Sequence, residues 1–151
     1  MIEETIEKWH RHLRGELPGG LDELLHDDVV FFSPVVFTPQ KGKAITKLYL
    51  RAAGETLPGE DTAGNGSGAG GGKFRYVKQV MSGNQAVLEF ETRVVGKYVN
   101  GVDLITCDDA GRIVELKVMI RPLQAVNAVH ERMRAMLEAL SAGAPAKLSP
   151  P

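Results

Sequence analysis

Apolar side chains recur at helical spacing in three stretches of the chain. The first stretch shows the pattern most clearly, with spacings of four, three and four residues: Ile2, Ile6, Trp9 and Leu13. Side chains at these spacings share one face of a helix. The same periodicity predicts a second long helix over residues 42–57 and a third that begins after Pro122, with a short helical turn at 21–25.

Runs of β-forming residues dominate the second half of the chain. Four of them follow in series and are separated by turn sequences of hairpin length: 74–81, 85–95, 98–107 and 112–121. Loops this short leave no room for crossovers, so we expect an antiparallel meander. Two further extended runs, 29–32 and 35–37, lie on either side of Pro34. Helices that come first and strands that follow in a run predict an α+β domain.

Composition and charge then narrow the classes of function. The 151 residues carry 18 Lys and Arg against 19 Asp and Glu, a formal net charge of −1, which argues against a nucleic-acid partner. Cys107 is the only cysteine, so a disulfide within the chain and a zinc site built on paired thiols are both excluded. We expect Cys107 to be a small buried hydrophobic residue. With no apolar run of membrane-spanning length, a cytoplasmic location and no membrane partner are expected.

Glycine is unevenly distributed along the chain. Eight of the 17 glycines fall between residues 54 and 72, and the segment 59–72 has no apolar side chain that could anchor it beyond two alanines. We therefore expect a mobile loop there. The domain is predicted to be single, to span residues 1–141, and to be followed by a flexible tail at 142–151.

This order of elements resembles the nuclear transport factor 2-like fold, a cone of curved antiparallel sheet with helices plugging its concave side. Three stretches carry the resemblance, which covers about residues 2–123: 21–30, 33–45 and 101–114. The superfamily includes ketosteroid isomerases, SnoaL-like polyketide cyclases and limonene epoxide hydrolases. The resemblance thus implies a pocket for a small molecule and chemistry without a cofactor.

Aligned with the ketosteroid isomerases, the chain keeps one of three functional positions. Asp103 falls at the position similar to the acid of the oxyanion hole, whereas Ser33 falls at that of the catalytic base and Trp9 at that of the oxyanion tyrosine. Serine cannot accept a proton at neutral pH without a base of its own, and indole has no titratable proton near pH 7. Isomerisation by the usual mechanism of that family is therefore not expected.

Asp103 is also unusual when its own strand is considered. It stands among Val102, Leu104 and Ile105, where aspartate is disfavoured and a buried carboxylate must be paired or neutral. If Asp103 faces the pocket, desolvation should raise its pKa and make it a hydrogen-bond donor or a general acid. The alternative is that it points outward or binds an arginine or a backbone amide.

The alternation of strand residues gives candidate walls for the pocket. The following residues are expected at its edge or on the inner face of the sheet: Trp9, Ser33, Tyr49, Leu88, Phe90, Leu116, Val118 and Ile120. The alternative is that they belong to the packed hydrophobic core and line no pocket. Such a pocket suits a small apolar or aromatic molecule with one polar group. The opposite face is charged, and we expect a homodimer through it. Its residues are Glu89, Glu91, Arg93, Glu115, Lys117, Met119 and Arg121.

Other constellations are weaker. An epoxide hydrolase would need an Asp-Arg-Asp arrangement, but Arg93 and Arg121 are both expected on the outer face. His10 and His12 lie about 200° apart on their helix, so they cannot share a metal ion and are expected to be solvated. His26 precedes two aspartates, and we expect it to have a structural role in the turn there. No metal site is predicted.

Three functions remain open at this point. The first is a cofactor-free enzyme, an isomerase, cyclase, dehydratase or hydrolase, that uses Asp103 as acid or base. The second is a noncatalytic protein that binds an apolar metabolite, which the serine at position 33 favours. The third is a protein-interaction module that uses the sheet face or the last helix.

Overall fold

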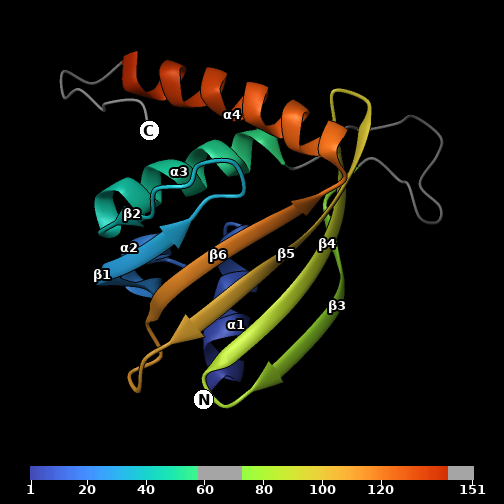
Figure 1. Cartoon of the computed structure of the whole chain (residues 1–151). Coiled ribbons are helices and arrows are strands. Elements are labelled where there is room, and N and C mark those ends of the chain that lie inside the picture. The colour runs from blue at the N-terminus through green and yellow to red at the C-terminus, as the bar shows by residue number, and fades with distance from the viewer. Residues whose placement is uncertain (58–72, 143–151) are drawn as a thin grey trace.

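The computed structural model describes residues 1–57 and 73–142, which form helices packed on one side of a curved sheet (Figure 1). The expected loop at 59–72 and residues 143–151 of the expected tail lie outside the described residues. The predicted helices and the four predicted strands in series are confirmed to within a few residues. In chain order the elements are α1 (Ile2–Leu13), α2 (Gly20–Leu24), β1 (Leu25–Phe32), β2 (Gln40–Lys41), α3 (Lys43–Thr56), β3 (Arg75–Ser82), β4 (Gln85–Val94), β5 (Lys97–Cys107), β6 (Ile113–Arg121) and α4 (Leu123–Ala142).

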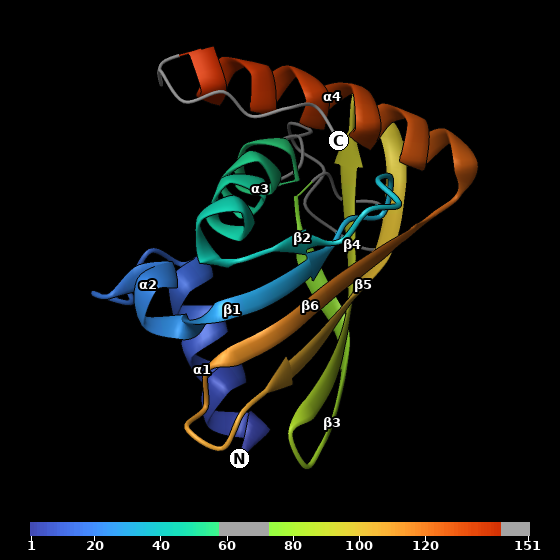
Figure 2. The ribbon, with the colours of Figure 1, turned by 60° about the vertical axis from the view of Figure 1, so that its left-hand side comes forward.

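The six strands form one mixed sheet in the order β2-β1-β6-β5-β4-β3. β3 to β6 pair antiparallel with their neighbours in sequence, as the hairpin-length turns predict. β1, however, runs parallel to β6, which the sequence analysis did not anticipate. A parallel pair needs a long connection, and here α3 and the whole meander supply it. The strands bend around the helices, which lie on the concave side (Figure 2).

The expected extended run at 35–37 does not form a strand. Residues 33–39 make bends instead, and Phe37 is 98% exposed. Pro34 and Pro39 flank this run and have no backbone N–H to give to a sheet, so the chain pairs again only at the two-residue strand β2.

The helices divide the concave side between them. At one end α1 begins beside the β3–β4 turn, where the backbone N–H of Ile2 donates to the carbonyl of Gly83 over 3.1 Å. At the other end α3 and α4 pack against each other and against β1 and the strands of the meander. Ala125, Val129 and Met133 are the buried positions of α4, which follows their helical spacing. No helix in the described ranges is long and apolar enough to cross a membrane.

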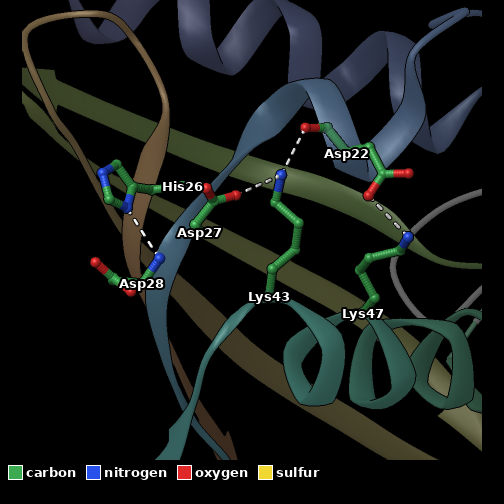
Figure 3. Close-up of polar contacts among 6 residues, drawn as sticks. All are labelled: Asp22, His26, Asp27, Asp28, Lys43 and Lys47. Atoms are coloured by element: carbon green, nitrogen blue, oxygen red, sulfur yellow. Dashed lines mark hydrogen bonds and ion pairs between the residues drawn. The ribbon is translucent and has the colours of Figure 1, made fainter.

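A group of polar contacts holds α3 against the start of β1 (Figure 3). Lys43, the first residue of α3, donates to the backbone carbonyl of Asp22 over 2.9 Å and lies 3.2 Å from the carboxylate of Asp27. One turn later Lys47 contacts the Asp22 carboxylate over 2.8 Å. These contacts join the first turns of α3 to α2 and to the start of β1.

Candidate functional site

A cavity of about 500 Å³ lies between the concave face of the sheet and the helices α1, α3 and α4. Its walls are mainly apolar and include Leu50 and Ala53 from α3, and Val129 and Met133 from α4. This volume lies within the range of pockets that bind small molecules in other proteins.

Asp103 lies in the floor of this cavity and is only 7% exposed. Its position follows from the pleat of β5, in which odd-numbered residues point to the concave side. The hydroxyl of Tyr76 on β3 donates to Oδ2 of Asp103 over 2.6 Å, and the indole N–H of Trp9 on α1 donates to the Tyr76 oxygen over 2.9 Å. Three elements thus contribute to one hydrogen-bonded chain, Trp9–Tyr76–Asp103.

Burial controls the protonation of this chain. Desolvation raises the pKa of Asp103 from 3.8 to about 7, although the hydrogen bond from Tyr76 acts in the opposite direction. Desolvation and the neighbouring Asp103 charge hold the pKa of Tyr76 well above 10. Near pH 7, therefore, Tyr76 is a neutral donor and Asp103 is divided between its acid and its carboxylate.

The protonated form of Asp103 can hold the polar group of a ligand. Tyr76 occupies Oδ2, and within residues 1–57 and 73–142 no other side chain or backbone group bonds to this carboxyl group. A proton on Oδ1 is then available to an oxygen atom of a ligand in the cavity. In its ionised form the same group would accept a proton, so Asp103 can act as a general acid or as a general base.

Gly101 shapes the aromatic wall beside Asp103. It lies between Phe90 and Ile120 in neighbouring strands, and the Phe90 ring leans across the space that a side chain at 101 would fill. Phe90 stacks on Phe74 with ring centroids 4.9 Å apart, and Tyr76 meets both rings edge-on. The missing side chain at 101 therefore lets three aromatic rings assemble around the carboxyl group.

The expected site residues divide into two groups. Seven of the nine line the cavity: Trp9, Ser33, Phe90, Asp103, Leu116, Val118 and Ile120. The other two, Tyr49 and Leu88, lie in the core instead. Tyr49 packs on Phe31 with ring centroids 5.4 Å apart, and Leu88 is fully buried in the sheet. Alternation predicts which side chains point inward, but it does not distinguish a cavity wall from packed core.

Ser33 has no basic partner in the structure. Its Oγ accepts a hydrogen bond from the backbone N–H of Val35 over 3.1 Å, and in the described part of the chain this is its one side-chain hydrogen bond. Serine in this setting stabilises a bend and does not accept a proton from a ligand. Ser33 therefore lacks the neighbouring base that, as the sequence analysis noted, a serine needs in order to accept a proton.

Two residues of the site were missed by the sequence analysis. Tyr76, in the first strand of the meander, carries no sequence signal that it would reach Asp103. The pairing register of β3 with β4 shifts just after Tyr76, and the sequence does not show this shift. His12 was expected to be solvated, which is wrong: it is half-buried and lines the cavity. A signal was present, because His12 follows Trp9 by three residues and so lies on the same helix face.

His10, His26 and Cys107 have local roles. His10 is 3.2 Å from the side-chain oxygen of Gln79, outside the cavity. His26 accepts the backbone N–H of Asp28 at Nδ1 over 2.9 Å, in keeping with the expected role in its turn (Figure 3). Cys107 is buried, as predicted.

Neither an epoxide hydrolase arrangement nor a metal centre is formed by the described residues. Arg121 donates to Asn100 on the outer face of the sheet and does not approach Asp103. In the ranges 1–57 and 73–142, no group of three His, Cys, Asp or Glu side chains is placed to hold a metal ion.

Solved structures place the chain in a family. No protein-family model matches it, and neither does any curated protein. A crystal structure of a steroid delta-isomerase from Pseudomonas aeruginosa is 33% identical, with a TM-score of 0.78 over 93% of this chain and 94% of that one. The chain belongs to the nuclear transport factor 2-like superfamily. The superfamily includes isomerases and polyketide cyclases.

Two more distant structures support the same fold. A protein from Silicibacter pomeroyi with a cystatin-like fold is 26% identical, with a TM-score of 0.72 over 92% of this chain and 90% of that one. A SnoaL-like protein from Jannaschia is 12% identical, with a TM-score of 0.59 over 84% and 92% of the two chains. For this nuclear transport factor 2-like protein, such remote likeness supports the fold alone.

Proposed function

We propose that the protein is a cofactor-free enzyme that moves a proton within a mainly apolar carbonyl compound, as an isomerase does. The observation that carries this proposal is the buried Asp103, held by Tyr76 in the floor of an apolar cavity. A carbonyl oxygen seated there would accept a hydrogen bond from the protonated acid. That bond strengthens as the oxygen gains negative charge, which lowers the barrier to removing a proton next to the carbonyl group.

The similarity to a steroid delta-isomerase suggests a first substrate to try. A β,γ-unsaturated 3-ketosteroid is apolar, has a carbonyl group at one end and becomes a conjugated enone when its double bond moves. The size and lining of the cavity are compatible with a ligand of this kind. The proposal differs from the usual ketosteroid isomerase in one respect, because Ser33 cannot serve as the base.

The first experiment measures turnover of that ketosteroid by the ultraviolet absorption of the conjugated product. We expect turnover by the unsubstituted protein, and at least a ~100-fold lower kcat for Asp103→Asn, because an amide donor stabilises the developing oxyanion less well. Tyr76→Phe removes the hydroxyl that holds Asp103 and should also lower kcat. Asp28→Asn, an exposed aspartate away from the cavity, is the matched control and should leave the rate unchanged.

Binding is measured separately with the conjugated ketosteroid. Its absorption band moves to longer wavelength when the carbonyl oxygen accepts a strong hydrogen bond, and this shift should shrink in Asp103→Asn. Neither a shift nor turnover with the unsubstituted protein would refute the proposal. A shift without turnover would instead favour a noncatalytic protein that binds apolar metabolites, the alternative suggested by the lack of a basic partner for Ser33.

We also propose that two copies of the chain associate through the convex face of the sheet. Charged residues border this face, but its centre is apolar and exposed: Val80 (55%), Val87 (38%) and Met119 (51%). Val80 and Val87 are direct neighbours on β3 and β4, with Leu104 and then Lys117 next in the same row. An apolar centre bordered by both signs of charge is complementary to its own two-fold copy.

Val87→Glu should convert this dimer to a monomer, because it would bury two like charges at the centre of the contact. Static light scattering at micromolar concentration measures the mass. Leu123→Glu, at an exposed position on α4 and not on a strand of the sheet, is the control and should remain dimeric. A monomeric mass for the unsubstituted protein would contradict the proposed association.

A further inference from the structure

The cavity contains a second titratable side chain that can exchange a proton near neutral pH. His12 lies one helical turn after Trp9 on α1, with the two ring centroids 6.1 Å apart. Trp9 in turn bonds to Tyr76, and Tyr76 bonds to Asp103. His12 and Asp103 are therefore the two ends of one series of neighbours along the cavity wall. Both residues line the cavity, and His12 is half-buried whereas Asp103 is buried.

Within residues 1–57 and 73–142 the imidazole of His12 contacts the Trp9 ring but has no polar partner. Among the described residues, no side chain or backbone group makes a hydrogen bond or an ion pair with either ring nitrogen. The charged or titratable groups that share the cavity are Arg14 from the end of α1, Lys73 before β3, Tyr76 and Asp103. The lining contributed by α3, β6 and α4 has no charge. A ligand is thus the available partner for this ring.

We infer that His12 is the general base of the pocket and accepts the proton that Ser33 cannot accept. This inference rests on the proposed function. In the step, a ring nitrogen of His12 takes a proton from the carbon next to the ligand's carbonyl group. The electron pair of that C–H bond forms a carbon–carbon double bond, and the carbonyl oxygen becomes an enolate that accepts the hydrogen bond of Asp103. The imidazolium then returns the proton to a different carbon of the ligand, which shifts the double bond and restores neutral His12.

The surroundings of the two groups favour this division of roles. Burial lowers the pKa of His12 below its usual value of 6.5 and raises that of Asp103 to about 7. The imidazole therefore has the lower pKa of the two groups, which is the reverse of the usual order. Between the two values the imidazole is neutral and the carboxyl group is protonated, as a base and a donor must be. Groups whose environments displace their pKa values in this way are the expected acid and base of a site.

The rate should therefore depend on pH in a bell shape. kcat/KM falls below the pKa of His12, because the base becomes protonated, and falls above about pH 7, because Asp103 loses its proton. His12→Gln should lower kcat at least ~100-fold on the β,γ-unsaturated ketosteroid and remove the acid limb of the profile. The shift of the enone band on binding should remain, because Asp103 is untouched.

Two further variants make the test specific. His12→Ala should regain part of its rate when imidazole is added to the solution, which a merely structural role for the ring would not produce. His130→Gln is the matched control, because His130 is exposed on α4 and does not line the cavity, whereas His10 packs edge-on against Tyr76. Its kcat and pH profile should be those of the unsubstituted protein.

The outcomes separate this inference from the proposed function. If the protein isomerises the ketosteroid and His12→Gln does so within ~3-fold of the same rate, His12 is not the base, and the proposed function stands. If the protein binds the conjugated ketosteroid but catalyses no reaction, both the proposed enzymatic function and the assignment of His12 as its general base are refuted. If it neither binds nor reacts, the proposed function fails, and this inference fails with it.

Discussion

Asp103→Asn is expected to stabilise the folded protein at pH 8, by about 4 kcal/mol, while it lowers the proposed activity at least ~100-fold. The reason is the cost of holding a carboxylate in the apolar cavity. A pKa displaced from 3.8 to about 7 means that the folded protein binds the Asp103 proton more tightly than the unfolded chain does. Asparagine has similar shape, can still accept the Tyr76 hydrogen bond, and bears no charge to bury.

The sign of the pH dependence follows from the same displacement. Below pH 3.8 the carboxyl group is protonated in both states and costs no ionisation energy. As pH rises from 3.8 to about 7, the unfolded chain ionises first, so the contribution of Asp103 to stability falls; above about 7 the loss is complete. The difference in stability between Asp103→Asn and the unsubstituted protein should therefore grow from near zero at pH 4 to its full value at pH 8.

Urea unfolding at a series of pH values measures this difference directly. Asp28→Asn, at an exposed position, controls for the removal of one negative charge from the molecule. If Asp103→Asn were less stable than the unsubstituted protein at pH 8, the carboxylate would be stabilising the fold and its burial would have another explanation. A stabilising substitution that destroys activity is characteristic of a site where function is maintained at the expense of stability.

The local elements of this protein could be predicted from the sequence because each has its own periodicity. The face of α1 and the alternation of β5 are properties of short segments, but the sequence left open whether Asp103 points inward or outward. The parallel pairing of β1 with β6 could not be predicted in this way, because it joins segments about 80 residues apart. The strand expected at 35–37 did not form, because Pro34 and Pro39 on either side of it have no backbone N–H to give to a neighbouring strand.

The site was harder to predict than the fold because its contacts cross between elements. The bond from Tyr76 to Asp103 depends on the register of three strands, including a shift just after Tyr76. Tyr49 and Leu88 show the reverse difficulty: both point inward, but whether an inward side chain meets a cavity or another side chain is decided by the packing of the helices. His12 is the exception: we expected it to be solvated, although its spacing of three residues from Trp9 indicates the inner face of the helix.

Gly101→Ala is expected to destabilise the protein by about 2–3 kcal/mol and to close part of the cavity. A Cβ atom at 101 would lie 2.5 Å from the tip of the Phe90 ring and 2.7 Å from the carbonyl oxygen of Met119. The ring could turn aside, but the carbonyl belongs to the backbone of β6 and cannot move without disturbing the sheet. The gain in strand propensity from alanine is too small to offset this overlap.

Gly54→Ala is the matched control, because the same methyl group should have the opposite effect there. Gly54 lies within α3, and a Cβ atom would meet nothing within 4 Å. Alanine should therefore stabilise the helix by about 1 kcal/mol. Urea unfolding of both variants tests the pair, and equal stability of Gly101→Ala and the unsubstituted protein would contradict the close packing described.

The binding of the conjugated ketosteroid gives the Gly101 variant a second readout. To avoid the new methyl group, the Phe90 ring must tilt away from Gly101, and the aromatic wall formed with Phe74 and Tyr76 would be disrupted. The Tyr76 hydroxyl that holds Asp103 belongs to the same wall, so the enone shift should weaken even in molecules that remain folded. An unchanged shift in a destabilised variant would mean that Gly101 serves the packing of the sheet and leaves the carboxyl group undisturbed.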